Sequence, residues 1–520
     1  MRISDSRGVR RPADVEAGPD DASSRDVPVR VLIRLSGEIT TKARRARARF
    51  LRTLADNLRE AGHAGGWDCR VSDEWSRLFL EAPDVGVLEQ IARVFGISSF
   101  SVVEAECAAR LEEIVRVGAE LYGERVRGRR FAVRARRSGR HPFDSQDVMR
   151  ELGAALNREA VVDLEEPEIE VQVEVRGGRA YLYSERVLGA GGLPLGVQRR
   201  AVALLSGGFD SAVAAWMMLR RGVALDYAFC NLGGGAYRRL VLEVAKSLAD
   251  RWSFGTQPEM HILDFGPVAG ELRAKVRPGY QQLVLKRWMY RAASRIAAER
   301  GADAIVTGEA VGQVSSQTLT NLRAIEEAAE VPVLRPLVGF DKGEIIQRAR
   351  DIGTHDLSSR VREYCAISPG RPVTAARPEA VGREEAALDP SILETVLAGR
   401  DVLALRSLDT MDIVAPALFV EDVPEGAIVI DTREEAEYRS WHWPGSIRRD
   451  FDELLRRYGE LDRDEEYVLY CAQGLRSGQL AERMQAAGYE AYSFRGGLPG
   501  LRRLAARRGL VRVDVGSEDS

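Results

Sequence analysis

The chain has 520 residues, of which 45% are hydrophobic and 29% charged, and its formal net charge is −3. This length predicts three or four domains of about 100–200 residues each, with the composition of a soluble globular protein. No apolar run approaches the roughly 20 residues that cross a bilayer, and no apolar signal region opens the chain, so no membrane association is expected. Five widely spaced cysteines without a C-x-x-C pair argue against a disulfide framework or a zinc ribbon and favour a cytoplasmic protein.

The first part of the chain divides into a polar tail and two α+β blocks. Residues 1–28 mix Pro, Gly, Ser and acids, which predicts a disordered tail. Residues 29–83 give a strand, a helix and two short strands, a pattern that suggests a ferredoxin-like domain. Residues 84–187 give helices, the strand "RFAVRARR" and a hairpin from "EIEVQVEV" to "RAYLYSE", which predicts a second α+β domain.

Strands and helices alternate in the part of the chain that begins with the glycine-rich connector at residue 188. The apolar runs "AVALL", "ALDYAFC", "EMHILDF", "DAIVTG" and "PVLRPL" are separated by helical segments, which predicts a doubly wound parallel sheet in residues 188–385. The stretch "PGRPVTAARPEAVGREEAALDP" is rich in Pro, Ala and charge and suggests a linker, which is placed at 386–405. A smaller α/β domain is expected at 406–509, followed by a tail at 510–520. The fold class is therefore multidomain, combining α/β and α+β domains.

Two basic clusters lie within the first 150 residues. Seven Arg and Lys residues face a single acid between residues 42 and 59, and "VRARRSGRHPF" forms the second cluster. Clustered arginines are typical of phosphate-backbone binding, although either cluster alone could be a solvated surface. Together they favour RNA or DNA binding, and the candidate contacts are Lys42, Arg44, Arg45, Arg134, Arg136, Arg137 and Arg140.

The stretch "ALLSGGFDSAVAAW" joins a buried strand to a helix through a tight glycine turn. Backbone N–H groups and the helix dipole converge in such a turn, which makes it an anion site. Gly207 and Gly208 allow the backbone to approach phosphates, and Ser206 and Ser211 add hydroxyl donors. Asp210 is expected to bind Mg²⁺, because a bare carboxylate would repel the phosphates. The pattern S-G-G-x-D-S resembles the signature of the PP-loop ATP pyrophosphatases; the alternative is a chance glycine turn.

Segments further along the chain support a nucleotide site. A strand ends at Thr307-Gly308-Glu309, and ligands of open parallel sheets bind at the carboxyl ends of strands. Gly308 and the polar loop Gln313–Gln317 are therefore expected at the nucleotide. Lys286 lies on a predicted helix and is either a charge partner for the phosphates or a surface lysine. The candidate ATP-binding residues are Leu204, Leu205, Ser206, Gly207, Gly208, Ser211, Lys286, Gly308 and Gln317.

A second chemical centre is predicted around Cys471. A buried strand ends at this residue, a short C-x4-R loop runs through Gly474 to Arg476, and a helix begins near Ser477. The helix N-terminus and the arginine favour a thiolate and are expected to lower the pKa of Cys471. The loop is one residue shorter than the C-x5-R loop of phosphatases and suits a persulfide sulfur. The segments "DTREEAEYRSWHWPGSI" and "FRGGLPGL" resemble those of rhodaneses; the alternative is a structural buried cysteine.

The order of these motifs resembles one family over nearly the whole chain, the tRNA 4-thiouridine synthetases or ThiI-type sulfurtransferases. The resemblance rests on "GEITTK", "FAVRARRSGRHPFDSQDV", "GGLPLG", "LSGGFDSAVA", "TGEAVGQVSSQTLTNL", "RPLVGFDK" and "EYCAISP". It implies that the second domain is a THUMP domain that binds RNA, that the third is a PP-loop ATP pyrophosphatase domain and that the fourth is rhodanese-like. The tail at 1–28 has no counterpart.

The resemblance also implies a reaction. With ATP and Mg²⁺, the PP-loop domain would adenylate O4 of the uridine at position 8 of a tRNA. Cys471, charged as a persulfide by a cysteine desulfurase, would deliver sulfur to C4 and displace AMP. Cys365 would be the resolving thiol, which forms a transient Cys365–Cys471 disulfide. The same persulfide could serve thiamine thiazole synthesis, and a homodimer is compatible with the sequence.

Two other classes of function remain open at this point. A PP-loop synthetase acting on a small molecule, with an accessory rhodanese domain, would explain the glycine turn but needs neither the basic clusters nor Cys471. A tRNA-binding module with a relic rhodanese domain would explain the arginines but not an intact Asp210.

Overall fold

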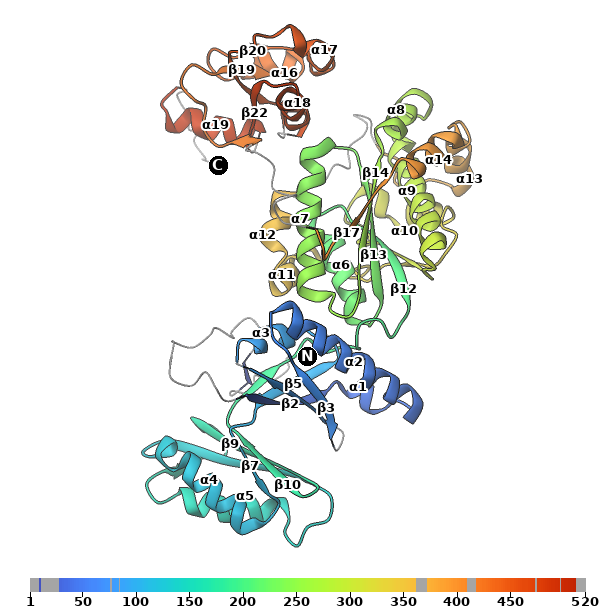
Figure 1. The fold of residues 1–520 in the computed structure, drawn as a ribbon. Helices are drawn as coiled ribbons and strands as arrows, with labels where there is room; N and C mark the ends of the chain where they lie inside the picture. The colour runs from blue at the N-terminus through green and yellow to red at the C-terminus, as the bar shows by residue number, and fades with distance from the viewer. Residues whose placement is uncertain are drawn as a thin grey trace, which may run out of the picture.

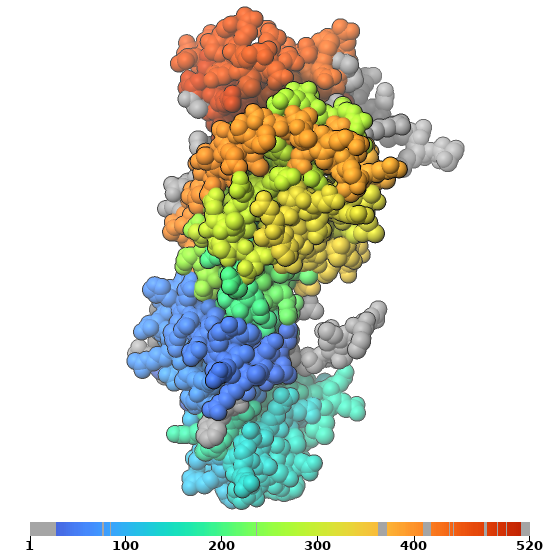
Figure 2. Space-filling view, turned by 90° about the vertical axis from the view of Figure 1, so that its right-hand side faces the viewer, coloured from blue at the N-terminus to red at the C-terminus, as the bar shows by residue number. Residues whose placement is uncertain are grey.

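The computed structural model describes residues 9–10, 28–74, 77–83, 85–361, 372–408, 418–472, 475–495 and 497–510. The described residues form four sheets, each of which belongs to one domain (Figure 1). Figure 2 shows the domains following one another along the molecule, with the fourth at one end and the second at the other. No helix in the described part of the chain is long and apolar enough to cross a membrane. The predicted multidomain fold class is confirmed.

The first domain is ferredoxin-like and extends beyond the expected boundary at residue 83. Its buried strand β2 pairs with β4 on one side and with β5 on the other, so the sheet needs residues up to Val102. The sheet order is β1-β11-β5-β2-β4-β3. Its elements are β1 (Val9–Arg10), β2 (Val29–Leu35), α1 (Gly37–Thr40), α2 (Arg44–Ala64), β3 (Arg70–Glu74), β4 (Arg77–Ala82), α3 (Val87–Ala92), β5 (Ile97–Val102) and β11 (Arg186–Leu188). Of the expected tail at 1–28, only residues 9, 10 and 28 are among the described residues.

The second domain has the sheet order β6-β10-β9-β7-β8, covered by two helices whose apolar faces share one core with the strands. Helix α5 begins with a capping box, because the side chains of Asp144 and Asp147 each accept a hydrogen bond from the other residue's backbone. The elements are β6 (Ala105–Ala108), α4 (Leu111–Val126), β7 (Arg130–Ser138), α5 (Ser145–Leu156), β8 (Val161–Val162), β9 (Ile169–Arg176) and β10 (Arg179–Tyr183).

A buried carboxylate joins the first two domains. Only 1% of the Glu174 side chain on β9 is exposed, and its oxygens lie 2.9 Å from Nε of Arg77 and 3.5 Å from Nη2 of Arg34, both in the first domain. Burial raises the pKa of Glu174, but the surrounding guanidinium groups outweigh burial and hold the pKa below its usual range. Removing one partner would leave a buried charge unpaired, which is costly. The network therefore fixes how the two domains pack.

The third domain is the doubly wound sheet that the alternating pattern predicts, with the strand order β16-β15-β12-β13-β14-β17. Separate hydrophobic cores lie on the two faces: α6, α7 and α11 contribute to one, and α8, α9, α10, α13 and α14 to the other. The elements up to the last helix are β12 (Arg200–Leu204), α6 (Phe209–Arg220), β13 (Ala224–Asn231), α7 (Gly234–Trp252), β14 (Glu259–Asp264), α8 (Gly266–Lys275), α9 (Pro278–Arg300), β15 (Ile305–Val306), α10 (Leu319–Glu326), β16 (Val333–Leu334), α11 (Lys342–Ile352), α12 (His355–Arg360), α13 (Pro378–Glu385) and α14 (Pro390–Ala398).

The segment 386–405, expected to be a linker, is instead part of the third domain. Helix α14 buries Leu393, Val396 and Leu397 in a core of this domain. Strand β17 (Asp401–Ala404) then pairs antiparallel with β14 and forms the edge of the sheet. The stretch rich in Pro, Ala and charge that suggested a linker is 369–390, whereas residues 386–405 contain one Pro and are mostly apolar, as their burial against the sheet requires.

The fourth domain is an all-parallel sheet in the order β18-β22-β21-β19-β20. Two small cores lie within it, and Tyr467, Val468, Leu469 and Tyr470 of its central strand are all buried. Its elements are β18 (Phe419–Val420), β19 (Ile428–Asp431), α16 (Glu435–Ser440), β20 (Ile447–Arg448), α17 (Phe451–Arg457), β21 (Glu466–Tyr470), α18 (Leu475–Ala486), β22 (Glu490–Phe494) and α19 (Gly497–Arg507).

Candidate functional site

The glycine turn lies between β12 and α6 at the carboxyl edge of the third sheet. Gly207 has φ +78°, a conformation that glycine adopts without strain. The hydroxyl groups of Ser206 and Ser211 lie 3.2 Å apart across the turn. A methyl group built on Gly308, which follows the neighbouring strand β15, would lie 2.6 Å from the backbone of Asp210 and Ser211. The absence of a side chain at Gly308 therefore lets the two strand ends close around one site.

A cavity opens beside this turn and is lined by both apolar and polar side chains. The candidate ATP residues Leu204, Leu205, Ser206, Ser211, Lys286, Gly308 and Gln317 all line it, together with Asp210, whereas Gly207 and Gly208 form the adjoining turn. Further lining comes from Ala228, Phe229, Cys230, Leu232, Tyr237, Met289, Tyr290, Thr307, Glu309, Gln313 and Val314. The apolar part suits a nucleobase, and the turn with its hydroxyl groups suits phosphates.

Asp210 is held between two side chains from other segments. Nζ of Lys342 lies 2.8 Å from one carboxylate oxygen of Asp210, and Nε2 of Gln313 donates to the other at 2.8 Å. Among the described residues, no group of three or more His, Cys, Asp or Glu side chains could hold a metal ion. A single carboxylate still fits Mg²⁺ that is shared with phosphate oxygens, which is the usual way this ion is bound at nucleotide sites.

A buried ion network supports the wall of the cavity. Glu309 lies 2.9 Å from Nζ of Lys286 and 3.0 Å from Nε of Arg335, and the Tyr290 hydroxyl also donates to it. Burial alone would raise the pKa of Glu309. Lys286 and the other partners have the larger effect and lower this pKa to about 2. Because this pKa is depressed, the stabilisation from these ion pairs is present at neutral pH and is lost progressively as the pH falls from the usual pKa of 4.5 to about 2.

The side chains of Lys342, Tyr290, Arg335 and Tyr237 are part of this site but were missed by the sequence reasoning, whereas Gln313 belongs to the loop that was expected there. Lys342 is the last residue of the segment "RPLVGFDK", on which the family resemblance partly rests. Its position could have been inferred from that segment, because a lysine near a phosphate site can pair with negative charge. The Tyr237 hydroxyl donates to the Ser206 carbonyl oxygen at 3.0 Å. The sequence gives no indication of this contact, because only folding brings α7 next to the turn.

The cavity fits a nucleotide by one further criterion. The side-chain oxygen of Gln317 is buried and has no hydrogen-bond partner among the described residues, although buried amide oxygens are normally satisfied. Gln317 lines the cavity, so a bound group with an N–H donor would satisfy this oxygen. An adenine amino group has the required chemistry.

Cys471 directly follows the central strand β21 of the fourth domain and is buried. Its sulfur accepts a hydrogen bond from the Ser477 hydroxyl, 3.5 Å away, and this hydroxyl also lies 2.9 Å from that of Ser493. The Arg476 guanidinium packs on the ring of Phe451 and lies 3.8 Å from a carboxylate oxygen of Asp452. A parallel strand, the cysteine and a helix start thus meet as the motif predicts. Gly474 and Cys365 lie outside the described residues.

The basic residues divide into paired and unpaired groups. A groove of about 590 Å³ between α2 and β3 is lined by Arg44, Arg47, Arg52 and Arg59. Arg134 is paired with Glu170, and Arg137 donates to the Gly139 carbonyl oxygen. In the described part of the chain, no ion-pair partner faces Lys42, Arg44, Arg45, Arg47, Arg52, Arg136 or Arg140.

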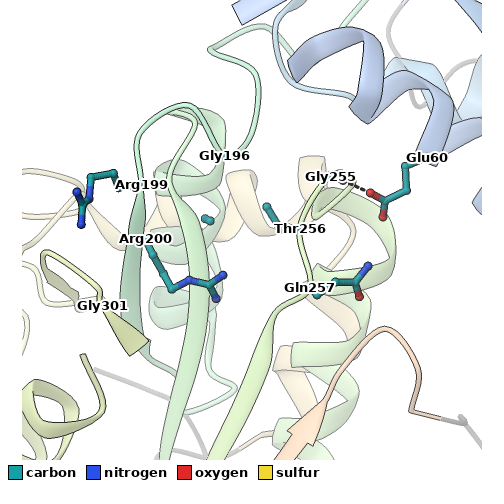
Figure 3. Close-up of a pocket in the computed structure, with 9 residues that line it drawn as sticks. Glu60, Gly196, Arg199, Arg200, Gly255, Thr256, Gln257 and Gly301 are labelled. Atoms are coloured by element: carbon teal, nitrogen blue, oxygen red, sulfur yellow. Dashed lines mark hydrogen bonds between the residues drawn. The ribbon is translucent and has the colours of Figure 1, made fainter. Parts of the chain in front are cut away.

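A second cavity, of about 620 Å³, lies at the opposite edge of the third sheet (Figure 3). Glu60 of the first domain accepts a hydrogen bond from the Gly255 amide at 2.7 Å and is also paired with Arg406. Arg200 is paired with buried Asp226, and Arg199 with Asp303. Glu60 thus joins the first domain to the third, whereas Arg199 and Arg200 are paired within the third domain.

A nucleotide cavity and a cysteine loop of the rhodanese type on one chain define a nucleotide-dependent sulfurtransferase. The family models agree with this class. Residues 196–389 match that of the thiamine biosynthesis protein ThiI, and 30–101 match the ThiI ferredoxin-like domain. Residues 108–185 match the THUMP domain and 417–503 the rhodanese-like domain.

Relatives that match about nine-tenths of the chain narrow this class to one family. A tRNA sulfurtransferase of Pyrobaculum aerophilum is 41% identical over 470 residues, covering 89% of this chain and 96% of that protein. One of Desulfurococcus amylolyticus is 41% identical over 471 residues, covering 90% and 97%. A crystal structure of a 4-thiouridine synthetase–RNA complex with bound ATP superposes with a TM-score of 0.64 at 31% identity, covering 72% of this chain and 99% of that one. The chain belongs to the tRNA sulfurtransferase family.

Replacing Gly308 by Ala tests the close approach of the two strand ends. The added methyl group would meet the backbone of Asp210 and Ser211 at 2.6 Å, and overpacking of this kind costs about 1–3 kcal/mol. We expect the Kd for a non-hydrolysable ATP analogue, measured by titration calorimetry, to rise by roughly tenfold or more. Gly270→Ala is the control, because nothing lies within 4 Å of its added methyl group. Equal affinities for the two variants would contradict this role for Gly308.

Proposed function

We propose that this chain is an ATP-dependent tRNA sulfurtransferase that converts a tRNA uridine, at position 8, to 4-thiouridine. The observation that carries the proposal is the combination of the cavity at the Ser206–Ser211 turn with the Cys471 loop in one chain. The first activates an oxygen and the second carries sulfur, and exchanging a carbonyl oxygen for sulfur requires both. Unpaired arginines in the first two domains supply a surface for the RNA.

The adenylation step uses the third domain. The uridine O4 attacks the α-phosphorus of ATP, the N3 proton is lost, and pyrophosphate leaves. The turn amides with Ser206 and Ser211 bind the departing phosphates, and Gln317 orients the adenine. Asp210 would hold Mg²⁺, which neutralises phosphate charge when bound, and Lys342 keeps the Asp210 carboxylate oriented.

The sulfur-transfer step uses the fourth domain. The terminal sulfur of a Cys471 persulfide attacks C4 of the adenylated base, the C4–O bond breaks, and AMP leaves. The resulting Cys471–S–S–C4 disulfide is cleaved when a second thiolate attacks the Cys471 sulfur, which releases the base as 4-thiouridine. A cysteine desulfurase is the proposed source of the persulfide, and a cytoplasmic thiol reductant restores the enzyme. The persulfide could also serve thiamine thiazole synthesis, and the enzyme could act as a homodimer.

We predict that Cys365 supplies the second thiolate. Its attack forms a Cys365–Cys471 disulfide, of the transient kind that reducing compartments tolerate in catalysis. Peptide mapping without reductant after one turnover should recover the cross-linked peptide. A Cys365→Ala variant should complete at most one poor turnover. Normal cycling of that variant without any reductant would contradict the resolving role.

Asp210→Ala should abolish tRNA thiolation, because it removes the carboxylate that Lys342 and Gln313 hold at the phosphate end of the cavity. The RNA-binding arginines are untouched, so the Kd for tRNA should change little. Thiolation is measured by mass spectrometry of the tRNA nucleosides, and binding by filter retention. Cys471→Ala is the matched variant: it should keep ATP-dependent adenylation and lose persulfide transfer. Full thiolation by Asp210→Ala would contradict the nucleotide site, and tRNA without 4-thiouridine from the parent enzyme would favour a small-molecule substrate.

The unpaired arginines should contribute to the salt dependence of RNA binding. Replacing Arg44, Arg47 and Arg52 by Ala, or Arg136 and Arg140 by Ala, should weaken tRNA binding at low salt. Each lost phosphate contact should flatten the plot of log K against log salt by about 0.7–0.9 units. Arg116→Ala, which removes an exposed arginine already paired with Glu120, should leave the slope unchanged. An unchanged slope of log K against log salt in the first two variants would show that these clusters are solvated surfaces that do not contact RNA.

A further inference from the structure

Helix α18 of the fourth domain packs on the first turns of α7 in the third domain. Nη1 of Arg239 on α7 lies 2.7 Å from Oε1 of Glu482 on α18. Both side chains are about one-quarter exposed, at 24% and 29%, so water screens this ion pair only in part. Figure 1 shows the fourth domain beside the N-terminal end of α7, the helix that follows β13.

Two consecutive glycines make room for this contact. A methyl group built on Gly235 would lie 2.1 Å from Oε1 of Glu482, and one built on Gly234 would lie 3.0 Å from Cγ of Gln479. Gln479 and Glu482 are three residues apart and therefore lie on one face of α18. Gly234 has φ +72°, a conformation that by itself favours glycine, so the close approach explains a poor helix former only at Gly235. The Glu482 carboxylate also meets the positive end of the α7 dipole.

Each of the two helices also belongs to a chemical centre. Tyr237 of α7 lines the nucleotide cavity and donates to the Ser206 carbonyl oxygen of the phosphate turn. Helix α18 begins just after the Cys471 loop, and its Ser477 donates to the Cys471 sulfur. The contact thus joins the helix beside the phosphate turn directly to the helix that follows the sulfur-carrying cysteine.

We propose that Gly234, Gly235 and Arg239 form a docking site for Gln479 and Glu482 that holds the rhodanese-like domain at the nucleotide edge of the third domain during sulfur transfer. The inference rests on the function proposed above. Docking raises the effective concentration of the Cys471 persulfide at the activated base, so rapid transfer does not depend on random encounters between tethered domains. Arg239 and Glu482 are positioning residues, since they act through the placement of Cys471.

The test compares two sulfur donors in single turnovers with tRNA and ATP. Enzyme carrying a persulfide on Cys471 depends on docking, whereas added sulfide reaches the adenylated base without it. Arg239→Glu and Glu482→Arg place like charges in contact and should each slow the persulfide reaction by roughly tenfold. The double variant restores opposite charges and should recover most of the rate. The sulfide reaction should stay unchanged in all three.

Gly235→Ala separates docking from folding. Alanine is the better helix former, so α7 should be at least as stable, yet the methyl group occupies the space of the Glu482 carboxylate. The carboxylate is the flexible end of the Glu482 side chain and can move away from Arg239. The persulfide reaction should therefore slow by less than in the charge-reversed variants, while the melting temperature should be unchanged or higher. Arg457→Glu is the control, because its partners Glu453 and Glu460 lie within the fourth domain.

The outcomes are distinct. Unchanged or faster persulfide transfer in the single variants, or no recovery in the double variant, would overturn the docking site. A parallel loss of the sulfide reaction in the variants would assign the effect to the nucleotide site and would likewise overturn it. If the parent enzyme itself fails to thiolate tRNA with sulfide and ATP, the function proposed above fails instead.

Discussion

Both chemical centres depend on one constraint of parallel sheets: a buried strand ends where a helix begins, and the free backbone amides of the helix meet there. In the third domain this junction is the turn between β12 and α6, and in the fourth it is the Cys471 loop between β21 and α18. The edge of the third sheet that carries the nucleotide cavity adjoins the rhodanese-like domain, while the opposite edge adjoins the first domain through Glu60 and Gly255. Activation and sulfur delivery can therefore share one edge, with the RNA-binding domains attached at the other.

Buried charges fix the parts whose mutual placement matters. Glu174 joins the first two domains, and Glu309 sets the cavity wall with Lys286 and Arg335. Such pairs add little net stability, but breaking them is costly, so they specify geometry. Lys286 had been expected to face the phosphates or the solvent. It lines the cavity, and its ammonium group pairs with Glu309.

Much of the nucleotide site could be predicted from local sequence. The turn residues from Ser206 to Ser211 are contiguous, and Gly308 follows a recognisable strand, so the rule that ligands bind at strand ends placed them together. Lys342 and Tyr237 could not be assigned this way, because each reaches the turn from a distant segment. The observed domain boundaries differ from the expected ones for a related reason. Strands β5 and β17 belong to sheets whose other strands lie far away in the chain.

The family, the order of the domains and the motifs of both centres could be predicted from the residues alone, because they depend on short contiguous patterns of residue type. The folded molecule was needed to show which side chains surround Asp210, that the supposed linker at 386–405 completes the third sheet, and that α18 packs on the glycines of α7. These features arise from contacts between residues far apart in sequence. Such contacts leave no local periodicity, since their free energy is gained only when the separate elements pack together.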